Sequence, residues 1–190
     1  MIRDLSAWIE QHAVSSPDRV AIRFEGTEIS YRALHVRIQK TAGLLHNTHG
    51  VRLGDRVAYL GFNTPECVIV FFACARLGAI YLPLNWRLAL HELDHVLGHA
   101  EPKVLITDSP HRESAIRLVN GRPGCALIDH ANVVPVSEGR DTTLSESNFG
   151  GDPDVPLLLV YTSGTTGQPK GAELTQNASV SNTHLRAHET

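Results

Sequence analysis

The sequence predicts an α/β fold in which helices cover both faces of a parallel sheet. Three observations support this prediction. Short apolar runs alternate with helix-length segments between residues 57 and 129. Segment 65–77 is apolar almost all round, which is typical of a buried, central helix. The apolar run 155–160 leads directly into a segment rich in glycine and hydroxyl side chains. Strands separated by helices of this length favour βαβ units and therefore parallel strands.

The first third of the chain predicts a small hairpin followed by a helix. Residues 20–24 and 27–29 are strand-like and flank Glu25-Gly26, a turn sequence. Ser30 can cap a helix that ends near residues 47–50. The apolar face of this helix comprises Tyr31, Leu34, Ile38, Ala42 and Leu45.

The alternating region then continues to residue 129. We expect strands at residues 57–60, 80–82, 104–107 and 126–129, and helices at residues 65–77, 89–99 and 112–120.

The last third begins with a break in this alternation. Residues 131–154 are rich in Ser, Gly, Asp, Thr and Pro, which predicts a connector. After it we expect strand 155–160, a loop at residues 161–171, a short strand at residues 172–174 and a helix that begins near Asn177. No terminal cap is visible before Thr190, so we expect the chain to stop within a domain, truncated.

The segment 161–171 has the composition of a phosphate-binding loop. Its eleven residues, Tyr-Thr-Ser-Gly-Thr-Thr-Gly-Gln-Pro-Lys-Gly, contain five hydroxyls, three glycines and one lysine. Glycines allow close backbone approach to an anion, hydroxyls add hydrogen-bond donors, and a lysine adds positive charge. The segment therefore predicts a nucleotide triphosphate site.

Other motifs with similar composition fit the spacing less well. A P-loop needs a second glycine five residues after the first, and Pro169 stands five residues after Gly164. A dinucleotide-binding turn needs glycine at position 166, which is threonine. A plain hairpin that only connects two strands remains an alternative, because turns favour the same residue types.

The eleven-residue segment resembles the signature phosphate loop of the adenylate-forming superfamily, which contains acyl-CoA synthetases, luciferases and peptide-synthetase adenylation domains. Two weaker marks precede it, Ile29-Ser30-Tyr31-Arg32-Ala33-Leu34 and the stretch at residues 75–88. Pro83-Leu84-Asn85 followed by Trp86-Arg87-Leu88 is similar to the acyl-CoA synthetase branch. Thr175-Gln176 stands where many members carry Thr-His. The resemblance implies the N-terminal part of such an enzyme over residues 1–190, a partial AMP-binding domain.

The resemblance also implies a reaction and a set of roles. ATP and a small carboxylic acid would give an acyl-adenylate and pyrophosphate, and coenzyme A would then displace AMP to form a thioester. Lys170 would bring charge to the β- and γ-phosphates, and the rest of the loop would provide donors and close backbone approach. The implied phosphate-binding residues are Thr162, Ser163, Gly164, Thr165, Thr166, Gly167 and Lys170.

Several family elements are expected outside this chain. They are the acidic ligand of Mg²⁺, the ribose-binding aspartate, the hinge, the C-terminal domain with its lysine, and most of the acyl pocket. We therefore expect the catalytic residues to lie downstream and the isolated chain to be inactive. The acid, aliphatic or aryl, is not identified by the sequence.

A second motif, His91-Glu92-Leu93-Asp94-His95, fits the pattern of zinc proteases. Leu90, Leu93 and Leu97 define an apolar face, and the histidines at 91, 95 and 99 fall on the opposite side. Zinc ligands should instead line a cleft and include a third ligand. We therefore favour an exposed histidine stripe over a zinc hydrolase.

Composition predicts a globular, cytoplasmic protein. The 190 residues are 42% hydrophobic with a net charge of −3, which gives no basic field for nucleic acid. No apolar run is long enough for a transmembrane segment, and the N-terminus lacks a signal-peptide pattern. Cys67, Cys74 and Cys125 form an odd set without a Cys-x-x-Cys pair, which favours reduced thiols over disulfides or a metal site.

Two alternatives to a ligase portion stay open. The chain can be a non-catalytic nucleotide-binding or interaction fragment, or the zinc hydrolase considered above. A severed sheet would also expose apolar surfaces and strand edges, so we expect self-association.

Overall fold

The computed structural model describes residues 5–133, 154–162 and 170–178. The strands are β1 (Val20–Phe24), β2 (Thr27–Ser30), β3 (Arg56–Leu60), β4 (Ile80–Leu84), β5 (Val104–Thr107), β6 (Ala126–Asp129), β7 (Pro156–Thr162) and β8 (Lys170–Thr175). The helices are α1 (Ser6–Ser15), α2 (Tyr31–Asn47), α3 (Pro65–Leu77), α4 (Leu90–Ala100), α5 (Arg112–Val119) and α6 (His130–Val133).

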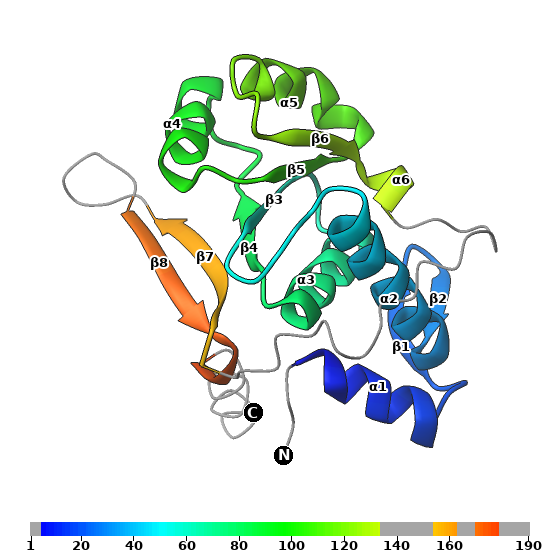
Figure 1. Ribbon diagram of the computed structural model, residues 1–190. Helices are drawn as coiled ribbons and strands as arrows, with labels where there is room; N and C mark the ends of the chain where they lie inside the picture. The colour runs from blue at the N-terminus through cyan, green and yellow to red at the C-terminus, as the bar shows by residue number, and fades with distance from the viewer. Residues whose placement is uncertain (1–4, 134–153, 163–169, 179–190) are drawn as a thin grey trace.

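Six strands form the main sheet in the order β6-β5-β3-β4-β7-β8 (Figure 1). The strands from β6 to β7 run parallel to their neighbours, and β8 runs antiparallel to β7. The predicted helix-covered α/β sheet is therefore confirmed. The antiparallel strand β8 is an addition to the parallel pattern.

Alternation along β3 explains why both faces of the sheet are covered. Val57 and Tyr59 belong to one apolar cluster, whereas Ala58 and Leu60 belong to another. Successive side chains of a strand point to opposite faces, so a strand that is buried on both faces is apolar throughout. Helices α2 and α3 lie on one side of the sheet, and α4 and α5 lie on the other (Figure 1).

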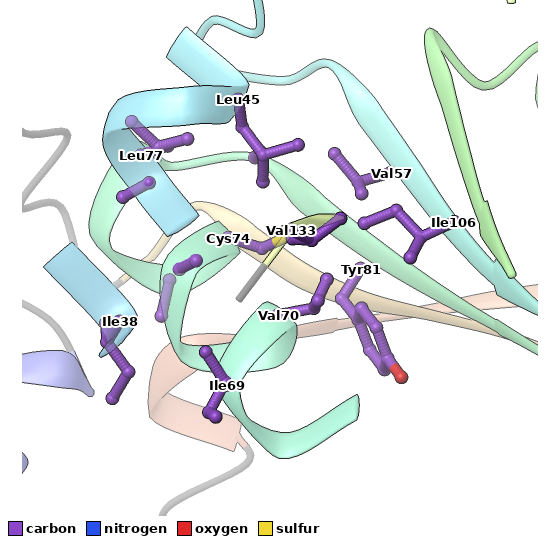
Figure 2. Packing of buried hydrophobic residues seen from close by; sticks show 14 of the residues in the cluster. Ile38, Leu45, Val57, Ile69, Val70, Cys74, Leu77, Tyr81, Ile106 and Val133 are labelled. Carbon is purple, nitrogen blue, oxygen red and sulfur yellow. The ribbon is translucent and has the colours of Figure 1, made fainter. Parts of the chain in front are cut away.

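Helix α3 is the centre of the first cluster (Figure 2). Pro65 starts the helix, where a missing N–H costs nothing, and Gly78 ends it at φ 65°. Ile69, Val70 and Cys74 are fully buried, which confirms the predicted central position. Burial raises the pKa of the Cys74 thiol well above its usual range, so this cysteine is an inert core residue.

The predicted hairpin and capped helix near the N-terminus are both present. β1 and β2 pair antiparallel around Glu25 and Gly26, which have φ values of 46° and 79°. Positive φ at both turn positions suits the right-handed twist of a two-residue hairpin. The Ser30 hydroxyl accepts a hydrogen bond from the Ala33 N–H at 3.3 Å and caps α2.

Helix α1 carries no start signal that the sequence could reveal. Its N-cap is Leu5, which makes no side-chain cap hydrogen bond. The helix is held by packing instead, because Trp8 and Ile9 contact the first apolar cluster. Tertiary contacts therefore create an element that local propensity does not predict.

Other boundaries differ from the predictions by a few residues. The connector expected at 131–154 begins later, because His130–Val133 form α6; residues 134–153 lie outside the described part. Thr41 on α2 donates a hydrogen bond from its hydroxyl to the Val133 carbonyl at 3.0 Å, which holds α6 against the core.

The free cysteines form no disulfide with one another. Among the described residues, no helix combines the length and apolarity needed to cross a membrane.

Candidate functional site

The segment predicted to bind phosphate joins the two strands of an antiparallel hairpin. Tyr161 is opposite Gly171 and Thr162 is opposite Lys170 in the register of β7 and β8. Strand pairing therefore includes two residues at each end of the expected loop. The loop end of the hairpin, formed by Thr162 and Lys170, is called its rim. Residues 163–169, with Ser163, Gly164, Thr165, Thr166 and Gly167 among them, lie outside the described residues.

Thr162 and Lys170 are both exposed at the end of the hairpin. Because they are cross-strand partners, a residue with a hydroxyl and a residue with an ammonium group stand opposite each other at the end of the hairpin. These are donor types that suit a phosphate group. Of the predicted site residues, the described structure therefore brings these two together.

The direction of β7 tells where this rim lies in the sheet. β7 runs parallel to β4, with Leu158 opposite Tyr81, so Thr162 lies at the carboxyl end of its strand. The carboxyl ends of β3, β4 and β5 are on the same edge. In open α/β sheets, ligands bind outside the carboxyl ends of the strands, where the strand order reverses. Here β3 lies between β4 and β5, so the reversal occurs beside β3.

An aromatic cluster occupies this edge, and sequence reasoning missed it. Phe62 follows β3, Trp86 follows β4, and His111 follows β5. The ring centroids of Phe62 lie 5.0 Å from Trp86 and 4.9 Å from His111. The Arg87 guanidinium lies 4.3 Å from the centre of the Trp86 ring. Phe62 is 42% exposed, so part of the cluster faces solvent. Aromatic or charged residues directly after predicted strands were the available signal.

Asp108 holds the cluster together. Its buried carboxylate accepts hydrogen bonds from the backbone N–H groups of Phe62 at 2.8 Å and His111 at 3.1 Å, and pairs with His111 Nδ1 at 2.5 Å. Gly61 makes this approach possible, because a β-carbon there would lie 2.8 Å from Asp108 Oδ2. The carboxylate thus ties the end of β3 to the end of β5. The groups that pair with this carboxylate all belong to Phe62 and His111 of the protein itself.

The His91-Glu92-Leu93-Asp94-His95 motif has a structural explanation. Glu92 Oε2 accepts a hydrogen bond from the Ala89 N–H at 2.8 Å, so this carboxylate caps the start of α4. His91 and His95 are exposed, as expected. Within the described ranges, no group of three His, Cys, Asp or Glu side chains is placed to hold a metal ion.

One detail of the predicted α4 faces is wrong. Leu90 is 38% exposed because it begins the helix, and Val96 and Ala100 complete the buried face with Leu93 and Leu97. His99 is exposed but bonded: its Nδ1 lies 2.5 Å from the Tyr161 hydroxyl.

Comparison with known proteins decides the family. A family model described as AMP-binding enzyme matches residues 9–189. The chain belongs to the AMP-binding enzyme family. This confirms the resemblance that the segment 161–171 indicated.

Relatives within the AMP-binding enzyme family include acyl-CoA ligases. The indoleacetate–CoA ligase of Aromatoleum aromaticum is 38% identical over 184 residues, which cover 92% of this chain and 35% of that protein. A feruloyl-CoA synthase of an Amycolatopsis species is 41% identical over 177 residues, with 90% and 33% covered. The chain thus spans about a third of the length of these relatives.

Solved structures of family members share the fold. A protein described as a putative long-chain-fatty-acid CoA ligase from Rhodopseudomonas palustris has a TM-score of 0.82 at 27% identity, covering 96% of this chain and 47% of that one. ATP-bound MatB from the same species has a TM-score of 0.80 at 29% identity, covering 97% and 37%. The AMP-binding fold thus extends over almost the whole of this chain.

Proposed function

We propose that this chain is the N-terminal portion of a longer ATP-dependent ligase that joins a carboxylic acid to coenzyme A. Family membership and the names of the relatives support the proposal. In the parent reaction, a carboxylate oxygen attacks the α-phosphorus of ATP, which gives an acyl-adenylate and releases pyrophosphate. The thiol sulfur of coenzyme A then attacks the acyl carbon, loses its proton, and displaces AMP.

The rim of the β7–β8 hairpin is the proposed phosphate site. The observation that carries the proposal is the pairing of Thr162 with Lys170 at the carboxyl edge of the sheet. Lys170 would lower the cost of charge on the departing pyrophosphate, and Thr162 would donate a hydrogen bond to it. We include Ser163, Gly164, Thr165, Thr166 and Gly167 in the same site on the basis of the sequence.

Magnesium would neutralise further phosphate charge in the parent enzyme. Its acidic ligand is proposed to belong to the rest of the parent enzyme, as the family resemblance implies.

The aromatic cluster of Phe62, Trp86 and His111 is a second proposed contact surface. A planar ring can stack on these side chains, and Arg87 can meet a nearby phosphate. ATP and coenzyme A both carry an adenine ring, so either co-substrate has the chemistry that this surface suits.

Aromatic carboxylic acids are the proposed substrate class of the parent. The relatives at 38% and 41% identity, which are named for indoleacetate and ferulate, support this proposal. At 33% identity a 2-succinylbenzoate–CoA ligase and an oxalate–CoA ligase both occur, so relatives at that distance do not favour one class of acid. A fatty acid–carrier-protein ligase is less similar, at 29%.

The phosphate site is tested by pyrophosphate and ATP binding to the purified 190-residue chain. Lys170→Ala removes the proposed charge and should weaken binding roughly ten- to hundredfold, because charge-assisted hydrogen bonds contribute about 1.5–3 kcal/mol. Lys40→Ala, on α2, is the matched control and should leave binding unchanged. Isothermal calorimetry gives the affinities. Equal loss in both variants, or a Lys170→Ala loss matched by a fall in melting temperature, would favour the plain connecting hairpin.

Carboxylate-dependent ATP–pyrophosphate exchange separates the ligase portion from a binding-only fragment. We expect the isolated chain to show no exchange with any aryl or fatty acid. Exchange by this chain would contradict the expectation that the catalytic residues lie downstream.

A further inference from the structure

Helix α4 is joined to the hairpin by a side-chain contact between residues 62 positions apart. Nδ1 of His99 lies 2.5 Å from the hydroxyl of Tyr161. Their ring centroids are 5.8 Å apart, and the planes meet edge to face at 84°. Either the tyrosine hydroxyl donates to the neutral imidazole, or Nδ1–H donates to the hydroxyl oxygen. Both arrangements hold the two rings in one orientation.

The tyrosine ring also lies across the hairpin. Gly171 is the register partner of Tyr161, and a β-carbon on Gly171 would lie 3.2 Å from Tyr161 Cζ and 3.0 Å from Leu159 Cδ1. The glycine therefore allows the ring to pack directly on the backbone of β8. His99, Tyr161 and Gly171 line one hollow of about 500 Å³ on this face of the sheet.

The contact lies next to the residues from which the phosphate loop departs. The register between β4 and β7 comprises a single pair, Tyr81 with Leu158. Tyr161 lies three residues further along β7, beyond that pair and directly before Thr162. On the other strand, Gly171 directly follows Lys170. A contact at Tyr161 and Gly171 therefore bears on the two residues from which the phosphate loop departs.

Two charged residues lie near the pair. Burial raises the pKa of the Tyr161 hydroxyl, Arg56 opposes this effect and Glu173 reinforces it. Arg56 lines the same hollow, but its guanidinium donates to the carbonyls of Ala100 at 2.7 Å and Glu101 at 3.2 Å, at the end of α4. Glu173 also lines it and is exposed on β8.

We propose that His99 and Tyr161 form a latch, the His99–Tyr161 latch, which fixes the loop end of the hairpin against α4 and so positions the phosphate site. Both are positioning residues, because they act through Thr162 and Lys170. The proposal rests on the proposed function for its effect on phosphate binding, but not for its effect on the hairpin.

The first arm of the test is amide hydrogen exchange along β7 and β8 in the full chain. Tyr161→Phe removes only the hydroxyl, and His99→Ala removes only the imidazole. Each should raise exchange at the loop end, near Thr162 and Lys170, about tenfold, with no change near Leu158 and Leu174. The double variant should exchange no faster than either single variant, since both remove the same contact. His95→Ala, one turn away on α4, is the control.

His99→Asn provides a rescue, because the asparagine amide places a polar atom where Nδ1 lies. It should restore most of the protection, which a general loss of packing would not allow. Additive effects of the two single variants, or a uniform rise in exchange along both strands, would overturn the latch.

The second arm measures pyrophosphate affinity of the same variants by calorimetry. Tyr161→Phe and His99→Ala should each weaken pyrophosphate binding about fivefold. His99→Asn and His95→Ala should leave the affinity near that of the unsubstituted chain. If the unsubstituted 190-residue chain binds no pyrophosphate, the proposed function fails, and amide hydrogen exchange still tests the latch. If exchange changes as expected while affinity does not, the latch exists but does not position the site, and the proposal is wrong.

Discussion

Gln176 shows how one side chain can join three distant parts of the chain. It is 2% exposed, and its Oε1 accepts a hydrogen bond from the Leu5 N–H at 2.8 Å. Its Nε2 donates to the Ala75 carbonyl near the end of α3 at 3.3 Å. Gln176 directly follows β8, so the amide links the hairpin to α3 and to the start of α1. An amide is the side chain that can both accept and donate here.

Gln176→Leu should destabilise the fold by about 2 kcal/mol, because it leaves a buried N–H and a buried carbonyl unsatisfied. Gln176→His should cost less, since an imidazole can still satisfy one of the two groups. Urea unfolding gives both values. Gln11→Leu, on the exposed surface of α1, is the control and should change stability by less than about 0.5 kcal/mol. If Gln176→Leu and the unsubstituted chain had the same free energy of unfolding, the Gln176 amide would make no net contribution to stability.

Strand β8 is an edge strand within the described part of the sheet. Lys170, Gly171, Ala172 and Glu173 are all exposed. An uncovered edge strand presents backbone N–H and carbonyl groups that can pair with another chain. The two faces of the sheet differ from this edge, because helices cover them over β3, β4 and β5.

We therefore predict that the 190-residue chain self-associates through β8. Ala172→Lys should weaken self-association about tenfold, because a charged side chain disfavours edge pairing. Ala131→Lys adds the same charge at an exposed position on α6 and serves as the control. Sedimentation over a range of concentrations measures the constants. A monomeric parent at all concentrations, or equal weakening by both variants, would show that β8 does not mediate association.

At the scale of the whole molecule, two partly buried histidines link stability to pH. Burial lowers the pKa of His35 on α2, an effect that Glu10 opposes and Arg76 reinforces. Burial also lowers the pKa of His49. The folded chain thus binds these protons less readily than the unfolded chain, whose histidines titrate near 6.5.

The free energy of unfolding should therefore fall as the pH decreases below about 6.5, because only the unfolded state gains these protons there. Above that pH both states are neutral at these sites, and the effect disappears. Urea unfolding between pH 7.5 and pH 5.5 measures the slope. His35→Gln should make the slope shallower, whereas His95→Gln, at an exposed site, should not. A slope that is unchanged in His35→Gln would remove His35 from this explanation.

Local signals in the sequence were sufficient for most elements. The bounds of α3, β5 and β6 match their predictions, because Pro65, Gly78 and short apolar runs with turn residues are features of the chain itself. The composition of segment 161–171 indicated a phosphate loop, and the resemblance of the same segment indicated the family, which the comparisons confirm. Helix α1 was missed because Leu5 offers no cap and packing stabilises the helix.

The sequence by itself determined the element types, the two-sided burial of the sheet and the family, because these depend on residue periodicity and on a contiguous motif. Only the tertiary structure decided the strand order, the antiparallel direction of β8 and the contacts of His99 with Tyr161 and of Asp108 with Phe62. Such contacts join residues 62 and 46 positions apart. They form because chain segments pack in three dimensions, so local propensity holds no record of them.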